Sequence, residues 1–223
     1  MEDKPDYLSR ETEEYLEAIC RLEEKSGLAR TNDLANQLGV VPGSITNTVE
    51  SLEKRGLIVH KPYRGVKLTE KGRKLALEVL RKHRLAERLI TDILRMDWSK
   101  AHETACRLEH AIPEDMVKPL EKALKHPQTC PHGNPIPTKY GTVPAEETEP
   151  LTDLNTGESA TIVKITEESC DLLQRLATLG LTPGENVEVE EKTPVDGLVV
   201  VRVRKVTHTL SYDLASVIQT RKL

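Results

Sequence analysis

The sequence predicts a mainly α-helical protein with a small β-barrel at its C-terminal end. Apolar residues recur at helical spacing up to about residue 126, six of the thirteen prolines fall in residues 127–150, and short β-like runs separated by turns follow from Leu151. A chain of 223 residues is long enough for two small hydrophobic cores. We therefore expect separate helical and β-rich domains joined by an extended connector.

The first elements predict a winged helix-turn-helix. Ser9 can cap a first helix, Thr31 can cap a short second helix, and Pro42 opens a third. Residues 57–69 then form two apolar or β-branched arms around a Pro-Tyr-Arg-Gly turn at residues 62–65, which is typical of a hairpin. Two short helices followed by a hairpin make a helix-turn-helix with a wing.

A helical middle domain follows. Thr69 can cap a long helix to about Leu94, a second helix covers residues 99–112, and Pro113 restarts the chain as a third helix to about His126. These helices carry more apolar surface than a thin layer can bury, which predicts a symmetric homodimer. The apolar residues are Leu85, Leu89, Ile93, Leu94, Ala105, Leu108, Ala111, Met116, Val117 and Leu120.

Changes of pattern along the chain suggest the domain boundaries. The winged helix-turn-helix would occupy residues 1–73, the helical dimerisation domain 74–140, a linker 141–150, and an SH3-like domain 151–223. Four runs are expected to form the strands of the last domain. They are SATIVKIT (159–166), ENVEVEEK (185–192), GLVVVRVRK (197–205) and LSYDLASVIQTR (210–221).

Composition narrows the classes of function. The apolar runs are strand-sized and the N-terminus has no apolar signal region, so we expect a cytoplasmic protein that does not enter membranes. Four widely spaced cysteines then make disulfides unexpected. With 3% aromatic residues and no Phe, the chain offers neither a base-stacking platform nor an aromatic pocket for a small organic substrate. Duplex DNA remains a possible partner.

Basic residues concentrate in the expected winged helix-turn-helix. The net charge is -4, but residues 28–75 hold nine Lys and Arg against four Asp and Glu, and phosphate contact requires only a local basic surface. The third helix offers short polar groups and no early Arg, so Asn47 and apolar contacts to thymine would give modest specificity. Base edges are expected to meet Pro42, Gly43, Ser44, Thr46, Asn47 and Thr48. Phosphates are expected to meet Arg30, Lys54, Lys61, Arg64 and Lys67.

Candidate metal ligands lie on two helices of the middle domain, in the patterns His83-x-x-x-Glu87 and His102-x-x-x-Cys106-x-x-Glu109-His110. Residues spaced by three, four or seven positions share a helix face, so these side chains can converge on cations at two neighbouring sites. Each residue alone could be a solvated side chain or an ordinary buried thiol. Together, a thiolate, imidazoles and carboxylates favour a first-row divalent metal over a hard ion such as calcium.

Several longer motifs resemble the diphtheria toxin repressor family of iron- and manganese-responsive regulators. The motifs are RKHRLAERLITDI, AHETACRLEHAI and HGNPIP, preceded by the helix-turn-helix. The segment LLQRLATLGLTPGENVEVEE is similar to the SH3-like domain of the longer members and to the ferrous iron transport protein A domain. The resemblance covers nearly the whole chain, and it implies a metal-activated repressor that binds palindromic operator DNA as a dimer and controls metal homeostasis genes.

The resemblance implies a primary, activating site formed by Cys106, Glu109 and His110 with a residue of the first helix, where Glu14 stands. Iron-responsive members carry Met at that position, whereas manganese-responsive members carry Asp and a Glu three residues later, which Glu17 matches. The soft thiolate favours Fe2+, and the hard carboxylates are also acceptable to Mn2+. We therefore expect Fe2+, with Mn2+ as the alternative, and two ions per subunit.

The resemblance also implies an ancillary site. In one arrangement His83, Glu87 and His102 are joined by groups of the SH3-like domain. In another, Cys130 and His132 of the connector join Glu87 and a carboxylate of the SH3-like domain. That carboxylate could belong to Glu168 or Asp171, and Cys130 and His132 could instead be plain turn residues.

Two other classes of function are compatible with parts of the sequence. A metal-dependent hydrolase could use His, Cys and Glu on helices, but no general base, phosphate-binding loop or nucleophile motif stands near the cluster. A metal-independent DNA-binding regulator could use the middle domain for dimerisation alone. The expected function is therefore regulation of transcription and not catalysis.

Overall fold

The structure is a computed structural model that describes residues 8–61, 64–193 and 197–223. It divides into two units: unit 1 holds Met1–Lys82 and Pro137–Thr142, and unit 2 holds His83–Ile136 and Val143–Leu223. The division falls within helix α4 (Glu70–Arg88), so the last part of this helix shares a unit with the β-rich domain. Within the described ranges, no helix is long and apolar enough to cross a membrane.

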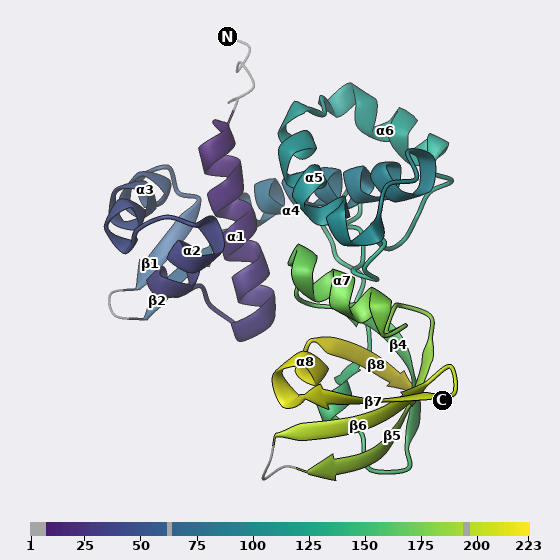
Figure 1. Cartoon of the computed structure of the whole chain (residues 1–223). Helices are drawn as coiled ribbons and strands as arrows, with labels where there is room; N and C mark the ends of the chain where they lie inside the picture. Colours follow the sequence, from purple (N-terminus) through teal and green to yellow (C-terminus); the bar gives the residue numbers. More distant parts are fainter. Residues whose placement is uncertain (1–7, 62–63, 194–196) are drawn as a thin grey trace. The chain divides into compact units, whose positions relative to one another are not determined.

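Unit 1 begins with three helices, of which the second and third form the predicted helix-turn-helix (Figure 1). The three helices are α1 (Arg10–Ser26), α2 (Thr31–Leu38) and α3 (Pro42–Lys54). Ser9 caps α1 through a hydrogen bond from the Thr12 backbone N–H, as predicted. The cap of α2 is Arg30 and its side chain accepts no hydrogen bond, so the prediction of a Thr31 cap was wrong.

The predicted wing is an antiparallel hairpin of β1 (Ile58–Lys61) and β2 (Gly65–Leu68). Residues 62 and 63 of the expected turn lie outside the described residues. Gly65 has a φ of +130°, and a Cβ there would lie 2.4 Å from the Ala29 carbonyl oxygen. Glycine therefore lets the hairpin approach the segment between α1 and α2. Thr69 accepts the Gly72 N–H at the start of α4, as predicted.

The helical part of unit 2 is less regular than the sequence suggests. After α4 the chain continues as a π-helix η1 (Leu89–Ile93), and α5 (Ala101–Leu108) lies between two 3-10 turns, η2 (Trp98–Lys100) and η3 (Glu109–Ala111). The last helix is α6 (Glu114–Ala123). Their common core consists of Leu85, Ala86, Ile90, Ala101, Ala105, Ile112, Val117, Leu124 and Ile136.

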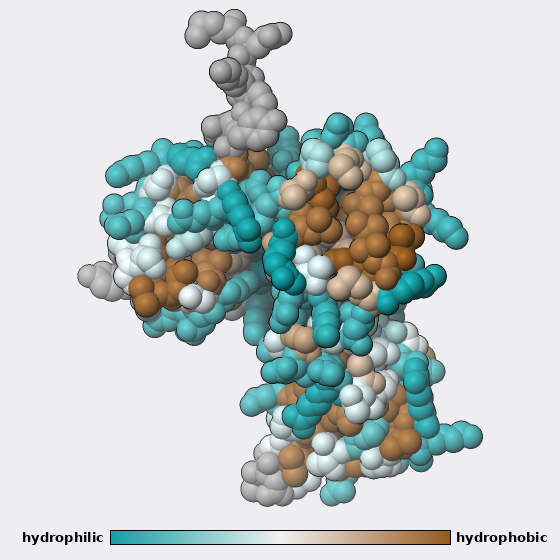
Figure 2. Space-filling model, turned by 45° about the horizontal axis from the view of Figure 1, so that its top comes forward, coloured by the Kyte–Doolittle hydropathy of each residue, from teal (hydrophilic) through white to brown (hydrophobic). Residues whose placement is uncertain are grey.

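Large apolar side chains remain exposed on these helices. Ile93, Leu94 and Met96 stand at and after the end of η1, and Met116 stands on α6, with exposed fractions from 41% to 56%. Figure 2 shows apolar side chains gathered on one face of the helical part of unit 2. Isolated exposed apolar residues are ordinary, but a contiguous group indicates a surface that is covered by another molecule.

The C-terminal part of unit 2 is a six-stranded antiparallel sheet in the order β3-β8-β4-β5-β6-β7. The strands are β3 (Glu149–Pro150), β4 (Ser159–Ile165), β5 (Asn186–Thr193), β6 (Leu198–Val203), β7 (Val206–Ser211) and β8 (Ile218–Lys222). Three helical segments accompany them: η4 (Leu151–Asp153), α7 (Cys170–Thr178) and α8 (Tyr212–Ser216). The mainly α fold with an SH3-like domain is confirmed.

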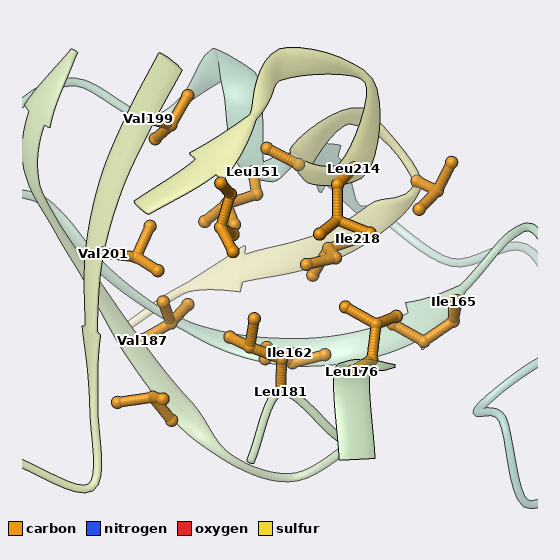
Figure 3. Packing of buried hydrophobic residues seen from close by; sticks show 14 of the residues in the cluster. Leu151, Ile162, Ile165, Leu176, Leu181, Val187, Val199, Val201, Leu214 and Ile218 are labelled. Atoms are coloured by element: carbon orange, nitrogen blue, oxygen red, sulfur yellow. The ribbon is translucent and has the colours of Figure 1, made fainter. Parts of the chain in front are cut away.

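Alternating residues of the strands build the core of this domain. In Figure 3, side chains of β4, β5 and β6, such as Ile162, Val187 and Val201, share one interior with Leu214 of α8 and Leu176 of α7. One prediction was wrong: the run 210–221 is not one strand but the end of β7, helix α8 and strand β8. The alternation fails there because a short helix separates the two strands.

Candidate metal centre

Helices α4 and α5 bring two imidazoles and a thiol together in unit 2. His83 is fully buried, and its Nε2 lies 3.1 Å from Nδ1 of His102 and 3.2 Å from Glu87 Oε1. The other nitrogen of His102, Nε2, lies 3.7 Å from Cys106 Sγ. His83 and Glu87 are one helical turn apart, as are His102 and Cys106, so each pair faces the same direction.

His83 also contacts the residue that follows α5. Its Nδ1 lies 2.5 Å from Glu109 Oε2, and the other oxygen of Glu109 lies 3.1 Å from His110 Nε2. Glu109 stands on the 3-10 turn η3, where the chain tightens at the end of α5. The imidazole of His83 therefore lies between the carboxylate of Glu109 and the group formed by Glu87 and His102.

The segment after α6 and the start of α7 add further ligands. His132 Nδ1 lies 3.2 Å from Glu87 Oε1, and Cys130 Sγ lies 3.9 Å from His132 Nδ1. Glu168, which precedes α7, lies 3.1 Å from His102 Nδ1 through Oε2 and 3.5 Å from His132 Nδ1 through Oε1. All of these side chains except that of His102 are buried.

Backbone contacts fix the segment that carries Cys130 and His132. Gly133 has a φ of +88°, and a Cβ there would lie 2.0 Å from the Val163 carbonyl oxygen, so only glycine allows this approach to β4. The Ile165 N–H donates to the His132 carbonyl at 2.9 Å. Asn134 donates from Nδ2 to the Ile165 carbonyl and, at 2.7 Å, to Glu168 Oε1. The ligand segment is thus attached directly to the SH3-like domain.

Buried charges perturb the pKa values of the imidazoles and of Glu87. Burial alone would lower the pKa of His83, but the Glu87 carboxylate and hydrogen bonds to Cys106 and Glu109 raise it well above its ordinary value. Burial and the nearby Glu168 charge would raise the pKa of Glu87, whereas the facing imidazoles hold it well below its ordinary value. Without a cation, protons on the imidazoles balance the carboxylate charges.

Burial and hydrogen bonds also have opposite effects on the pKa values of the groups on α5 and directly after it. Burial would lower the pKa of His102, but hydrogen bonds to Cys106, Glu168 and Glu87 raise it to about 11. Burial would raise the pKa of Cys106, but hydrogen bonds to His102 and His83 lower it to about 7. The Glu109 carboxyl is buried too, yet hydrogen bonds from His110 and His83 lower its pKa to about 2. At neutral pH Glu109 is therefore already ionised, and a metal ion that binds here would displace the proton of His102.

The donor atoms form three compact groups in unit 2. Within each group the ligand atoms lie within 4.8 Å of one another. The groups are His83, His102 and Cys106; His83, Glu87, His102 and Glu168; and Glu87, Cys130, His132 and Glu168. Oε2 of Glu87 is buried and has no hydrogen-bond partner among the described residues. Nitrogen, sulfur and carboxylate donors with an unsatisfied buried oxygen fit a first-row divalent cation.

The predicted site residues are distributed unevenly among these groups. Glu168 joins the ancillary ligands, whereas Asp171 is exposed on the first turn of α7. Cys106 faces His102, and none of the three groups above joins it with both Glu109 and His110.

The two acids predicted on α1 lie in unit 1. Glu14 forms an ion pair with Arg10 at 2.8 Å, and Glu17, which is buried, pairs with Arg21 at 2.9 Å. Each pair is one turn apart on α1.

The predicted DNA-contacting residues lie on the surface of unit 1. Ser44 Oγ donates to the Val41 carbonyl at 2.7 Å, and Thr48 Oγ1 donates to Glu11 at 3.4 Å, so both hydroxyls have partners within the unit. The others are exposed: Arg30, Pro42, Gly43, Thr46, Asn47, Lys54, Lys61, Arg64 and Lys67. Thr46 and Asn47 on the early turns of α3 are exposed, and their side chains form no hydrogen bond with another described residue.

Sequence reasoning missed three residues that support the ligands. Gly133 and Asn134 stand in the quoted HGNPIP motif, but no role was assigned to them. Trp98 was also passed over, although its indole N–H donates to the Pro131 carbonyl at 2.9 Å and its ring lies edge-on to His132. A glycine and an asparagine directly after two candidate ligands could have indicated a fixed turn.

Three consecutive parts of the chain match known protein families. Residues 7–66 match the iron dependent repressor N-terminal DNA binding domain, and residues 69–138 match the iron dependent repressor metal binding and dimerisation domain. Residues 149–222 match the FeoA domain. The iron-dependent repressor IdeR of Mycobacterium tuberculosis is 36% identical over 95% of this chain and 97% of its own length. The chain belongs to the diphtheria toxin repressor family.

Other members of the diphtheria toxin repressor family also align with nearly the whole of this chain. The diphtheria toxin repressor of Corynebacterium glutamicum is 34% identical over 95% of this chain and 96% of its own. A solved manganese-dependent transcriptional repressor in complex with manganese aligns with a TM-score of 0.89 at 28% identity, covering 95% of this chain and all of that chain. These relatives are transcriptional repressors, which confirms the expected function of metal-dependent repression and argues against the hydrolase.

Proposed function

We propose that the protein is an Fe2+-activated repressor that binds a palindromic operator as a cytoplasmic homodimer and controls genes of metal homeostasis. The observation that carries this proposal is the buried gathering of imidazole, thiol and carboxylate groups in the domain that matches metal binding and dimerisation. The adjoining matched domain supplies DNA binding. A metal-independent regulator would have no use for Glu87 Oε2, a buried carboxylate oxygen without a hydrogen-bond partner among the described residues.

The primary ion is proposed to be held by Cys106, Glu109 and His110, with Glu14 or Glu17 contributed by α1. A thiolate ligand favours Fe2+ over Mn2+, and the lowered pKa of Cys106, about 7, makes that thiolate accessible near neutral pH. Mn2+ is the alternative, because the carboxylates accept it readily. A second, ancillary ion would draw its ligands from the set His83, Glu87, His102, Cys130, His132 and Glu168.

Ligands from α1 and from α5 belong to different domains of the chain, which suggests how metal would control DNA binding. Without a bound metal ion, the carboxylates on α1 and the carboxylate of Glu109 repel one another, because all of them are negatively charged. A divalent cation supplies positive charge that both sides can share. Sharing one ion would restrict the position of α3 relative to the dimer core, and fixed spacing favours one operator.

For DNA recognition we propose that α3 enters the major groove and that the wing follows the backbone. Asn47 would read base edges, while Lys61, Arg64 and Lys67 of the hairpin would contact phosphates because all three are exposed. Homodimerisation is proposed to bury the exposed Ile93, Leu94, Met96 and Met116. A two-fold dimer reads half-sites that are related by two-fold symmetry.

Operator selection tests this proposal. Protein loaded anaerobically with Fe2+ is incubated with a pool of duplexes that contain a random segment, and bound duplexes are sequenced after several rounds. The expected result is an inverted repeat whose half-sites are displaced by about one helical turn, roughly 10 base pairs, or a multiple of it. Enrichment of a single unpaired half-site, or no enrichment with either Fe2+ or Mn2+, would overturn the proposal.

A further inference from the structure

Glu168 presents its two carboxylate oxygens to two different groups of ligands. Oε2 lies 3.1 Å from His102 Nδ1, whereas Oε1 lies 3.5 Å from His132 Nδ1 and 4.0 Å from Cys130 Sγ. The side chain is buried, so it stands between these groups and not in solvent. A carboxylate placed in this way can give one oxygen to each of two cations.

Glu87 lies between the same two groups. Its Oε1 is 3.2 Å from His83 Nε2 and 3.2 Å from His132 Nδ1. Its Oε2 is fully buried and has no hydrogen-bond partner among the described residues. A buried carboxylate oxygen without a partner is costly, and a cation within its reach would remove that cost.

The two arrangements of the ancillary site therefore need not be alternatives. Both occur together in this chain, and the only ligands that they share are Glu87 and Glu168. The other ligands differ between these two arrangements: His83 and His102 belong to one, and Cys130 and His132 belong to the other. One cation could not bind all six in this arrangement, because the described residues form no single group in which all six offer ligand atoms within 4.8 Å of one another.

We infer that the ancillary region holds two divalent cations side by side, bridged by Glu87 and Glu168. One cation takes the imidazoles of His83 and His102, and the other takes the thiolate of Cys130 and the imidazole of His132. Two divalent charges offset two carboxylates and a thiolate. The inference deepens the proposed function, because it concerns the ancillary ligands named there and adds an ion to them.

Counting bound ions tests the inference without any substitution. The metal-free full-length chain is saturated anaerobically with Co2+, freed of excess metal, and assayed for cobalt per subunit. The expected count is three, one at the primary site and two in the ancillary region. A count of two would mean that a single ancillary ion uses either group in turn, and it would overturn the inference.

Three ligand variants and one control sharpen this count. His102→Asn and Cys130→Ser each remove a ligand from one group only, so each should lower the count by one. A single ion that can use either group would leave the count of both variants equal to that of the unchanged chain. Glu168→Gln should lower it as well, whereas the exposed neighbour Glu167 provides the matched control: Glu167→Gln should keep three ions.

Electron paramagnetic resonance gives a readout that does not depend on the folding of variants. Two-metal sites hold their ions about 3.5–4 Å apart, close enough for magnetic coupling. Mn2+ in the ancillary region should give a coupled spectrum, and isolated six-line signals at saturation would contradict the inference. The effect of metal on DNA binding is measured separately. If DNA binding requires metal but only two ions bind, only this inference is overturned. If three ions bind but metal does not change DNA binding, only the proposed function is overturned.

Discussion

The main-chain carbonyl of Trp98 accepts a hydrogen bond from Nε2 of His132 at 3.1 Å. A carbonyl can only accept, so Nε2 carries a proton and Nδ1 is the nitrogen left for a cation. The indole ring lies 4.9 Å from the imidazole, centroid to centroid, and packs against the core of the SH3-like domain. Trp98 therefore connects the corner between α4 and α5 to a candidate ligand.

This contact makes Trp98, the only tryptophan, a natural reporter of metal binding at His132. We expect Co2+ to quench its fluorescence, and His132→Ala to remove at least half of that quenching. His208 on β7 belongs to none of the ligand groups in unit 2, so His208→Ala should leave the quenching unchanged. Equal quenching in both variants would show that the ion does not bind beside Trp98.

Gly133 is expected to be far more sensitive to substitution than its backbone angle alone explains. Gly133→Ala would place a methyl group 2.0 Å from the Val163 carbonyl oxygen, so β4 and the ligand segment would have to separate. We expect the free energy of unfolding to fall by about 3 kcal/mol or more and ancillary metal to bind more weakly.

Gly157 provides the matched control, because its φ is +84° and a Cβ there would meet nothing within 4 Å. Gly157→Ala should cost only the left-handed strain, about 1–2 kcal/mol. Urea denaturation of both variants measures the difference. Equal losses would mean that the close approach to β4 has no energetic weight.

A comparison of Cys106 with Cys20 distinguishes a cysteine that binds metal from one that only packs in the core. Cys106→Ala should weaken metal activation of operator binding at least about tenfold, since a ligand is lost. Cys20 is fully buried on α1, so Cys20→Ala should lower thermal stability and leave the metal concentration at half-activation unchanged. Anisotropy of a labelled operator, followed during titration with Fe2+, gives both values. An unchanged half-activation point in Cys106→Ala would exclude this thiol from the primary site.

Metal affinity should fall as the pH falls. In the metal-free protein His102 keeps its proton up to a pKa of about 11, so metal binding releases that proton at any neutral pH and acid opposes it. Below about 7 the Cys106 thiolate is protonated as well, which steepens the dependence. Competition with a chelator between about pH 6 and pH 8 measures the slope. Cys106→Ser should remove the extra steepness below pH 7, and an affinity that rose on acidification would contradict this account.

The sequence predicted the elements whose residues share one local pattern. Ser9 and Thr69 were identified as caps because an N-cap needs only a side-chain oxygen near the next turn, and both accept the expected N–H. The spacing of His83 and Glu87 indicated a shared helix face, where their atoms are in contact. Helical and strand periodicity is local, so it can be read without knowing the fold.

Features that depend on distant partners could not be read in this way. The choice of Glu168 over Asp171 depends on how the turn before α7 meets the helical part of unit 2, and both residues are acidic. Asn134 matters because it donates to Glu168, which lies far along the chain. Helix α8 has only five residues, a run too short to show a helical period between the strands on either side.

Linkage between metal binding and operator binding offers the most direct test of the proposal that bound metal controls the affinity for DNA. Operator affinity is measured anaerobically by anisotropy with Fe2+, with Mn2+ and with chelator, and metal affinity is measured with and without operator. We expect metal to raise operator affinity, and operator to raise metal affinity by the same factor. Identical operator affinity with chelator and with either metal would contradict the proposal.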